Sequence, residues 1–124
     1  MATNWQTHVD SLVGSGQVRG ACILNVKGFL VAKSNNINLH DGEGDKLIKV
    51  FTEPKTKGVT IHGVTYAIFK TDARSIYGKK GTNGCIVLKT SKSIIVGVYD
   101  STIPQEKATL AVEGLAARLI KDGL

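Results

Sequence analysis

The 124-residue sequence lacks a long apolar run, a paired-cysteine motif and a metal-binding histidine motif. No apolar stretch approaches the roughly 18 residues that a membrane-spanning helix needs. The N-terminal residues contain no apolar core of the kind found in a secretory signal. These absences favour a soluble intracellular protein.

The two cysteines, Cys22 and Cys85, are far apart, and each lies within an apolar run. This placement predicts two reduced thiols inside strands rather than a CxxC redox or zinc motif. It also favours a cytosolic setting.

No catalytic set is present in the sequence. The three histidines, His8, His40 and His62, have neither the HxxxH nor the HExxH spacing that fixes a metal ion. No serine has the G-x-S-x-G setting of a nucleophile. The segment 78–81, Gly-Lys-Lys-Gly, lacks the first glycine and the helix start of a phosphate-binding loop. We therefore expect a non-enzymatic protein that needs no cofactor or metal.

Positive charge is concentrated in one quarter of the chain. The formal net charge is +6, and residues 70–92 carry +5 of it, because their only acidic residue is Asp72. Localised positive charge can attract an acidic protein, an anionic lipid or a nucleic acid, and it can also form a merely solvated surface. The strands lack the exposed aromatic platform of single-strand nucleic-acid binders, which argues against a nucleic-acid partner. The basic residues are Lys70, Arg74, Lys79, Lys80, Lys89 and Lys92.

The order of expected elements is helix, strands, helix, strands, helix. Asn4 or Thr3 is the expected cap of the first helix, and Pro104 is expected at the first position of the last helix. Lys27-Gly28 and His62-Gly63 are expected as two-residue hairpin turns, and the segment 74–81 is expected to end in a glycine-flanked basic turn, Gly-Lys-Lys-Gly at 78–81. The predicted helices are 3–14, then 45–51, which stops before Pro54, and a last helix from 104 up to Gly123. The predicted strands are 20–26, 29–34, 59–61, 64–69, 76–77, 85–89 and 93–99.

These elements predict an α+β fold in one domain that covers residues 1–124. The length and the 42% hydrophobic content suit a single core. An antiparallel sheet of six or seven strands, with the first and last helices packed on one face, accommodates every element.

Three segments together resemble the profilin family, in particular its amoeba and plant branch. They are Trp-Gln-Thr-His-Val-Asp at 5–10, Arg-Ser-Ile-Tyr-Gly-Lys-Lys-Gly at 74–81, and the strand pair at 87–99 that contains Lys-Thr-Ser-Lys. The likeness extends over essentially the whole chain, to the helix that ends at Gly123. It implies a sheet with the terminal helices on one side and smaller helices on the other.

The resemblance also implies a monomeric protein that binds actin monomers and regulates filament assembly. Actin is acidic, so interface lysines would raise the rate of association. This activity implies a location in the cytoplasm, at the cytoskeleton and the cell cortex. The residues that match the family's actin site are Lys70, Arg74, Lys79, Lys80, Thr82, Lys89, Lys107, Thr109 and Glu113.

Profilins also bind proline-rich segments of actin-assembly factors such as formins, through aromatic rings that stack on a polyproline helix. This sequence keeps Trp5 of that groove. At the other groove positions the family usually has aromatic or ring side chains, and this sequence has His8, Val31, Arg118 and Leu124. The resemblance implies a groove for proline-rich segments, and these replacements predict that its affinity for them is weakened.

The third ligand that the family implies is phosphatidylinositol bisphosphate at a membrane surface. The matching residues are Lys79, Lys80, Lys89 and Lys92. Because these overlap the implied actin site, two functions stay open: an actin-monomer regulator, and a phosphoinositide-responsive membrane-surface adaptor in which actin binding is secondary.

Overall fold

A computed structural model describes residues 4–53 and 56–124 of the chain. Its helices are α1 (Trp5–Gly14), α2 (Glu43–Thr52) and α3 (Gln105–Lys121). Its strands are β1 (Gly20–Asn25), β2 (Leu30–Lys33), β3 (Gly58–Ile61), β4 (Val64–Thr71), β5 (Ser75–Lys80), β6 (Asn83–Lys89) and β7 (Ser93–Tyr99). None of these helices is long and apolar enough to cross a membrane.

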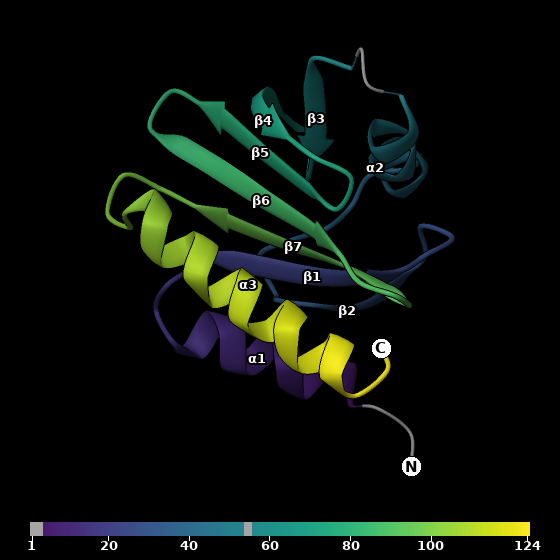
Figure 1. Cartoon of the computed structure of the whole chain (residues 1–124). Coiled ribbons are helices and arrows are strands. Elements are labelled where there is room, and N and C mark those ends of the chain that lie inside the picture. Colours follow the sequence, from purple (N-terminus) through teal and green to yellow (C-terminus); the bar gives the residue numbers. More distant parts are fainter. Residues whose placement is uncertain (1–3, 54–55) are drawn as a thin grey trace.

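The strands form one antiparallel sheet in the order β2-β1-β7-β6-β5-β4-β3 (Figure 1). Strands β3 to β7 follow one another as a meander, and β1 joins the sheet beside β7. The expected antiparallel sheet of six or seven strands is therefore confirmed.

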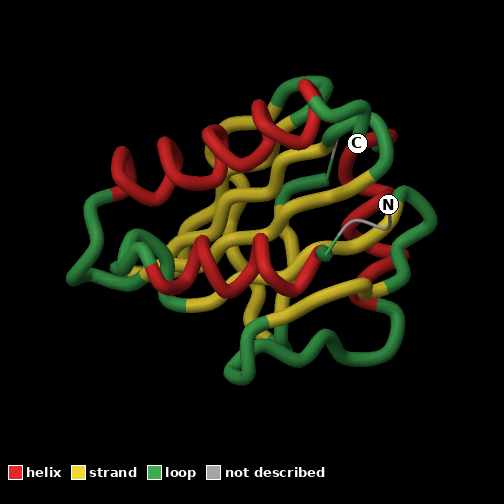
Figure 2. The backbone as a smooth tube through the Cα atoms, turned by 90° about the horizontal axis from the view of Figure 1, so that it is seen from below, coloured by secondary structure: helices red, strands yellow, loops and turns green. Residues whose placement is uncertain are grey.

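Helices α1 and α3 lie side by side on one face of the sheet, and α2 lies at the other face (Figures 1 and 2). Helix α1 contacts β1 and β2, whereas α3 contacts β6 and β7. The resemblance implied smaller helices on the second face, and within the described residues α2 takes that place.

Alternate residues of the central strands supply two separate cores, because successive strand side chains point to opposite faces. In β6, Ile86 and Leu88 pack with α1 and α3, whereas Cys85 and Val87 pack on the side of α2. Both cysteines are buried and free, as predicted. Burial raises the pKa of each thiol to about 12, because apolar surroundings disfavour the thiolate.

Three local predictions need correction. The β1–β2 turn is longer than two residues: the Gly28 amide donates to the Asn25 carbonyl and the Asn25 amide donates to the Phe29 carbonyl, with Gly28 at a φ of +92°. The strand predicted at 76–77 is longer, Ser75–Lys80, so Lys79 and Lys80 belong to β5 and the turn itself is Gly81-Thr82. Pro104 lies one position earlier than expected, at the N-cap of α3, because its ψ of 139° is extended.

The start of α1 and the β3–β4 turn agree with the sequence-based predictions. Asn4 caps α1 by accepting a hydrogen bond from the Thr7 amide at 3.1 Å, and Thr3 lies outside the described residues. His62 and Gly63 form the expected two-residue turn, with φ values of 53° and 75°. Pro54, which was expected to follow the second helix, is outside the described residues.

A buried carboxylate fixes the start of α2. Glu43 is only 4% exposed. Its Oε1 accepts hydrogen bonds from the amides of His40 and His62, and its Oε2 accepts one from the amide of Gly63. Glu43 therefore ties the first turn of α2 to the turn between β3 and β4.

Close backbone contact fixes the same end of α2 from another side. A Cβ at Gly44 would overlap the carbonyl oxygen of Gly28, so the β1–β2 turn rests directly on the helix. We expect Gly44→Ala to lower the free energy of unfolding by about 1 to 3 kcal/mol or more, because the two segments must move apart. Urea unfolding measures this change.

The matched control is Gly114→Ala, also within a helix, where an added Cβ has no atom within 4 Å. Alanine is favoured over glycine in helices by about 1 kcal/mol. This variant should therefore be more stable than the parent. Equal effects of the two substitutions would show that the Gly28–Gly44 contact is unimportant.

Candidate docking face

Strands β4 and β5 lie beyond the edge of α3, which contacts β6 and β7 (Figure 1). Phe69 of β4 is 49% exposed there. Its ring lies 6.3 Å from the ring of Tyr77 on β5. The Lys79 ammonium lies 5.5 Å from the Phe69 ring centroid, and the Lys70 ammonium lies 5.2 Å from that of Tyr77. Two aromatic rings and two cations thus form one cluster.

An irregularity in β4 assembles this cluster. Ala67 pairs with Lys79, Ile68 with Gly78 and Lys70 with Tyr77, so Phe69 is an extra residue in the ladder. In such a bulge two residues of one strand oppose a single residue of its partner. Phe69 and Lys70 therefore both contact Tyr77, although strict alternation would send them to opposite faces.

Helix α3 joins the cluster through Tyr77. The Tyr77 hydroxyl donates to Glu113 Oε1 at 3.3 Å. Burial raises the pKa of Tyr77, and the negative charge of Glu113 acts in the same direction. We use the name docking face for Phe69, Lys70, Tyr77, Lys79 and Glu113 together.

The structure brings only part of the predicted actin set to this face. Thr109 is four residues before Glu113 and lies on the same side of α3. Lys107 is turned away from Glu113 by about 120° around the helix. Thr82 lies at the tip of the β5–β6 hairpin. Lys80 lies beside the tip, where it pairs with Asn83.

Lys89 and its neighbours are at the other end of β6. The Lys89 ammonium lies 5.9 Å from the ring centroid of Phe51, which belongs to α2, so Lys89 points to the opposite face from the docking face. Arg74 is beside it, since the Lys89 amide donates to the Arg74 carbonyl at 2.7 Å. Strand geometry puts about 20 Å between the ends of β6. The predicted phosphoinositide lysines are therefore split, with Lys79 and Lys80 at one end and Lys89 and Lys92 at the other.

The turn that carries Arg74 is held by Asp72. Its Oδ1 accepts the amides of Arg74 and Ser75 at 2.8 and 2.9 Å. Hydrogen bonds from Ser75 and Arg74 lower the pKa of Asp72. The carboxylate of Asp72, the only acidic residue of segment 70–92, therefore hydrogen-bonds to the backbone of this turn.

The predicted proline groove lies along α1, β2 and the end of α3. Trp5 and His8 meet edge to face, with ring centroids 6.4 Å apart. Trp5 and Leu124 pack against the same core, and Leu124 is fixed because its carbonyl accepts the Thr90 hydroxyl at 2.7 Å. Val31 is 41% exposed on the edge strand β2.

Arg118 borders a different hollow. It lines a cavity of about 270 Å³ between α1 and α3, together with residues from the second half of α1. The other residues at this cavity are Ser11, Leu12, Ser15, Gln17, Leu110, Ala111, Gly114 and Leu115.

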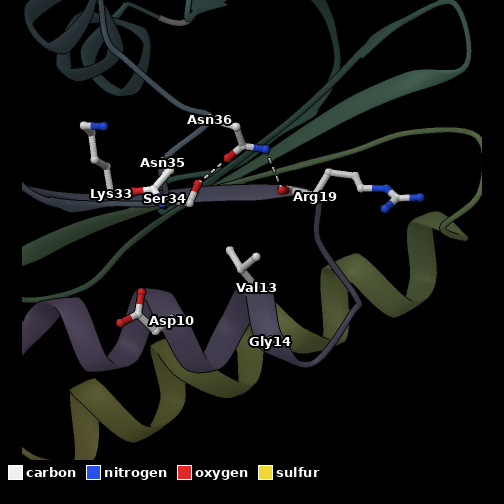
Figure 3. Close-up of a pocket in the computed structure, with 8 residues that line it drawn as sticks. All are labelled: Asp10, Val13, Gly14, Arg19, Lys33, Ser34, Asn35 and Asn36. Atoms are coloured by element: carbon white, nitrogen blue, oxygen red, sulfur yellow. Dashed lines mark hydrogen bonds between the residues drawn. The ribbon is translucent and has the colours of Figure 1, made fainter.

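A larger cavity, of about 400 Å³, lies between α1 and the segment after β2 (Figure 3). Asn36 is occupied there, because its amide donates to the Arg19 carbonyl and its oxygen accepts the Ser34 hydroxyl. The guanidinium of Arg19 is engaged elsewhere, with Asp100 at 2.8 Å. The cavity therefore contains no converging reactive set.

Sequence reasoning missed Phe69 and Tyr77 as members of the face. Both lie in apolar runs and were assigned only to strands. The bulge that exposes Phe69 has no signature in the sequence, whereas its neighbours Lys70 and Lys79 belong to the predicted actin set.

The fold and the face define an α+β binding protein, with one antiparallel sheet between terminal helices and a third helix. The Profilin family model matches residues 3–124. Profilin-1 of Dictyostelium discoideum is 41% identical, with 97% of this chain and 98% of that protein covered, and profilin-1A of Acanthamoeba castellanii is 43% identical over the same shares. The chain belongs to the profilin family.

Solved structures agree with this assignment. Acanthamoeba castellanii profilin IA is 42% identical and superposes with a TM-score of 0.93, covering 98% of this chain and all of the other. LokiProfilin1, solved in complex with rabbit actin, shares the fold at a TM-score of 0.82 and 16% identity, covering 98% of this chain and 97% of that one.

Proposed function

We propose that the docking face binds monomeric actin and that the protein thereby regulates filament assembly. One observation carries this proposal: an aromatic side chain, Phe69, is half exposed on the sheet and has a lysine ammonium over its ring. Membership of the profilin family supports it. The complex of LokiProfilin1 with rabbit actin concerns a distant relative that has the same fold.

The cluster has the composition of an interface centre. Aromatic residues that desolvate on binding contribute most of the affinity, whereas charges at the rim chiefly raise the association rate. Phe69 would supply the desolvated area, because Tyr77 is only 7% exposed and instead supports the Phe69 ring. Lys70, Lys79 and Lys80 would supply the positive field. The Tyr77 hydroxyl donates to Glu113, so α3 and the sheet both contribute to this surface.

Reversing two charges at the end of β5 tests this proposal. We expect Lys79→Glu combined with Lys80→Glu to weaken binding to actin monomers by about 1 to 3 kcal/mol, because each glutamate would meet an acidic partner. Lys79→Glu alone should account for most of the loss, since Lys79 contacts Phe69. Affinity is measured by titration into monomeric actin at physiological salt.

The control is Lys27→Glu combined with Lys46→Glu. Both lysines are exposed, in the β1–β2 turn and on α2, away from the docking face. The double variant changes the net charge by the same amount, so its actin affinity should stay near that of the parent. Equal losses in the two double variants would point to a nonspecific charge effect.

We also propose that proline-rich segments of actin-assembly factors bind weakly in the groove at Trp5. Trp5, His8 and Leu124 gather at the ends of α1 and α3, and Val31 offers only a small apolar surface. Arg118 would act at the border of the neighbouring cavity rather than as a stacking partner.

Restoring a ring at position 31 should strengthen this binding. We expect Val31→Trp to tighten the Kd for a proline-rich peptide by about threefold to tenfold, because each aromatic pair adds roughly 0.5 to 1.5 kcal/mol. Val26→Trp is the control, since Val26 is equally exposed, at 43%, but lies in the hairpin turn. Calorimetric titration distinguishes them, and equal gains would disprove a groove at Val31.

Phosphoinositide binding is proposed for the same protein as a competing interaction. A headgroup at the β5–β6 tip would meet Lys79 and Lys80, but the length of β6 prevents it from reaching Lys89 and Lys92 as well. A membrane-surface adaptor would therefore need two headgroups. We favour the actin regulator, a single-domain, non-enzymatic monomer in the cytoplasm and at the actin-rich cortex.

A further inference from the structure

Two histidines meet at a place that none of these proposals uses. His40 lies in the segment before α2, and His62 lies in the turn between β3 and β4. Their ring centroids are 5.6 Å apart, with an angle of 56° between the planes. The spacing along the chain gives no metal motif, and the fold alone brings the pair together.

The Nδ1 atom of each imidazole lies near an oxygen atom, and that of His62 is within hydrogen-bond distance. His62 Nδ1 lies 2.7 Å from the Asn38 carbonyl oxygen, and His40 Nδ1 lies 3.9 Å from Glu43 Oε2. A histidine that binds a metal typically directs its other ring nitrogen to a carbonyl or carboxylate, which fixes the ring and leaves Nε2 as the ligand. His62 has such a hydrogen-bonded partner, whereas the Glu43 carboxylate is near His40 Nδ1 without a hydrogen bond to it.

The Nδ1 atom of His62 also lies 2.9 Å from the Asn38 amide. It can therefore either donate to the carbonyl or accept from the amide, depending on the tautomer. A metal on Nε2 would select the first tautomer, in which Nδ1–H donates to the Asn38 carbonyl.

The backbone around the pair is already fixed. Glu43 Oε1 accepts the amide hydrogens of both His40 and His62, at 2.9 and 2.7 Å. The two histidines are thus held by one buried carboxylate, even though 22 positions separate them in the sequence. Because the backbone that carries the two ligands is already held in place, a metal ion would have to order less of the chain on binding.

We propose that His40 and His62 form a two-imidazole site for a divalent transition-metal ion of the zinc class. Imidazole suits zinc, copper and nickel, whereas magnesium and calcium require oxygen ligands. Among residues 4–53 and 56–124, no three His, Cys, Asp or Glu side chains converge on one point. Water therefore fills the other positions, and the ion exchanges readily. A bound ion would link the segment before α2 to the β3–β4 turn and stabilise the fold.

Zinc titration by calorimetry tests this site directly. The intact protein should bind one Zn²⁺, and magnesium should give no heat. His40→Asn and His62→Asn should each raise the Kd for zinc at least tenfold, in line with the loss of a ligand. Asparagine tolerates the positive φ of His62 and keeps a polar atom near the Nδ1 position.

His8→Asn is the control, because His8 lies on α1, beside Trp5. It should bind zinc as the parent does. Nitrogen NMR of the unsubstituted protein gives a second readout that needs no variant: Nε2 of His40 and His62 should shift on zinc addition, and Nε2 of His8 should not. No zinc binding at millimolar concentration, or affinity unchanged by both substitutions, would overturn the proposal.

Discussion

The docking face exists because the two terminal helices are too few to cover one side of a seven-stranded sheet. Helix α1 lies on β1 and β2, and α3 lies on β6 and β7. Strands β4 and β5 extend beyond α3, so no helix lies over these strands on this face, and their side chains Phe69, Lys70 and Lys79 are exposed to solvent. The bulge at Phe69, the lysines over the two rings and the Tyr77–Glu113 hydrogen bond are how this sequence completes that surface.

The opposite end of the sheet is organised by close backbone contacts. The β1–β2 turn packs on the first turn of α2 through Gly28 and Gly44, and Glu43 links that turn of α2 to His62 and Gly63. The same contacts that position α2 bring His40 and His62 together. The docking face and the histidine pair therefore arise from separate parts of the fold, and a substitution in one should leave the other intact.

Much of this architecture could be predicted from the sequence, because the apolar runs, glycine turns and helical spacing all indicate the same elements. The buried thiols followed from their apolar neighbours. The direction of Lys89 could not be predicted, since one shift in strand register moves a side chain to the other face. The exposure of Phe69 could not be predicted for a related reason: the apolar pattern that indicates a strand does not indicate where a bulge interrupts it. The roles of the predicted binding residues remain predictions, although their positions are now defined.

Hydroxyl-radical footprinting of the complex with monomeric actin would test the docking face most directly, because the chain contains its own reference. Phe69 and Phe29 are both well exposed in the free protein, at 49% and 67%, and they lie on β4 and in the β1–β2 turn respectively. If actin binds the docking face, oxidation of Phe69 should slow severalfold while oxidation of Phe29 stays unchanged. Protection of Phe29 with Phe69 still reactive would place actin on another surface and contradict the proposed interface.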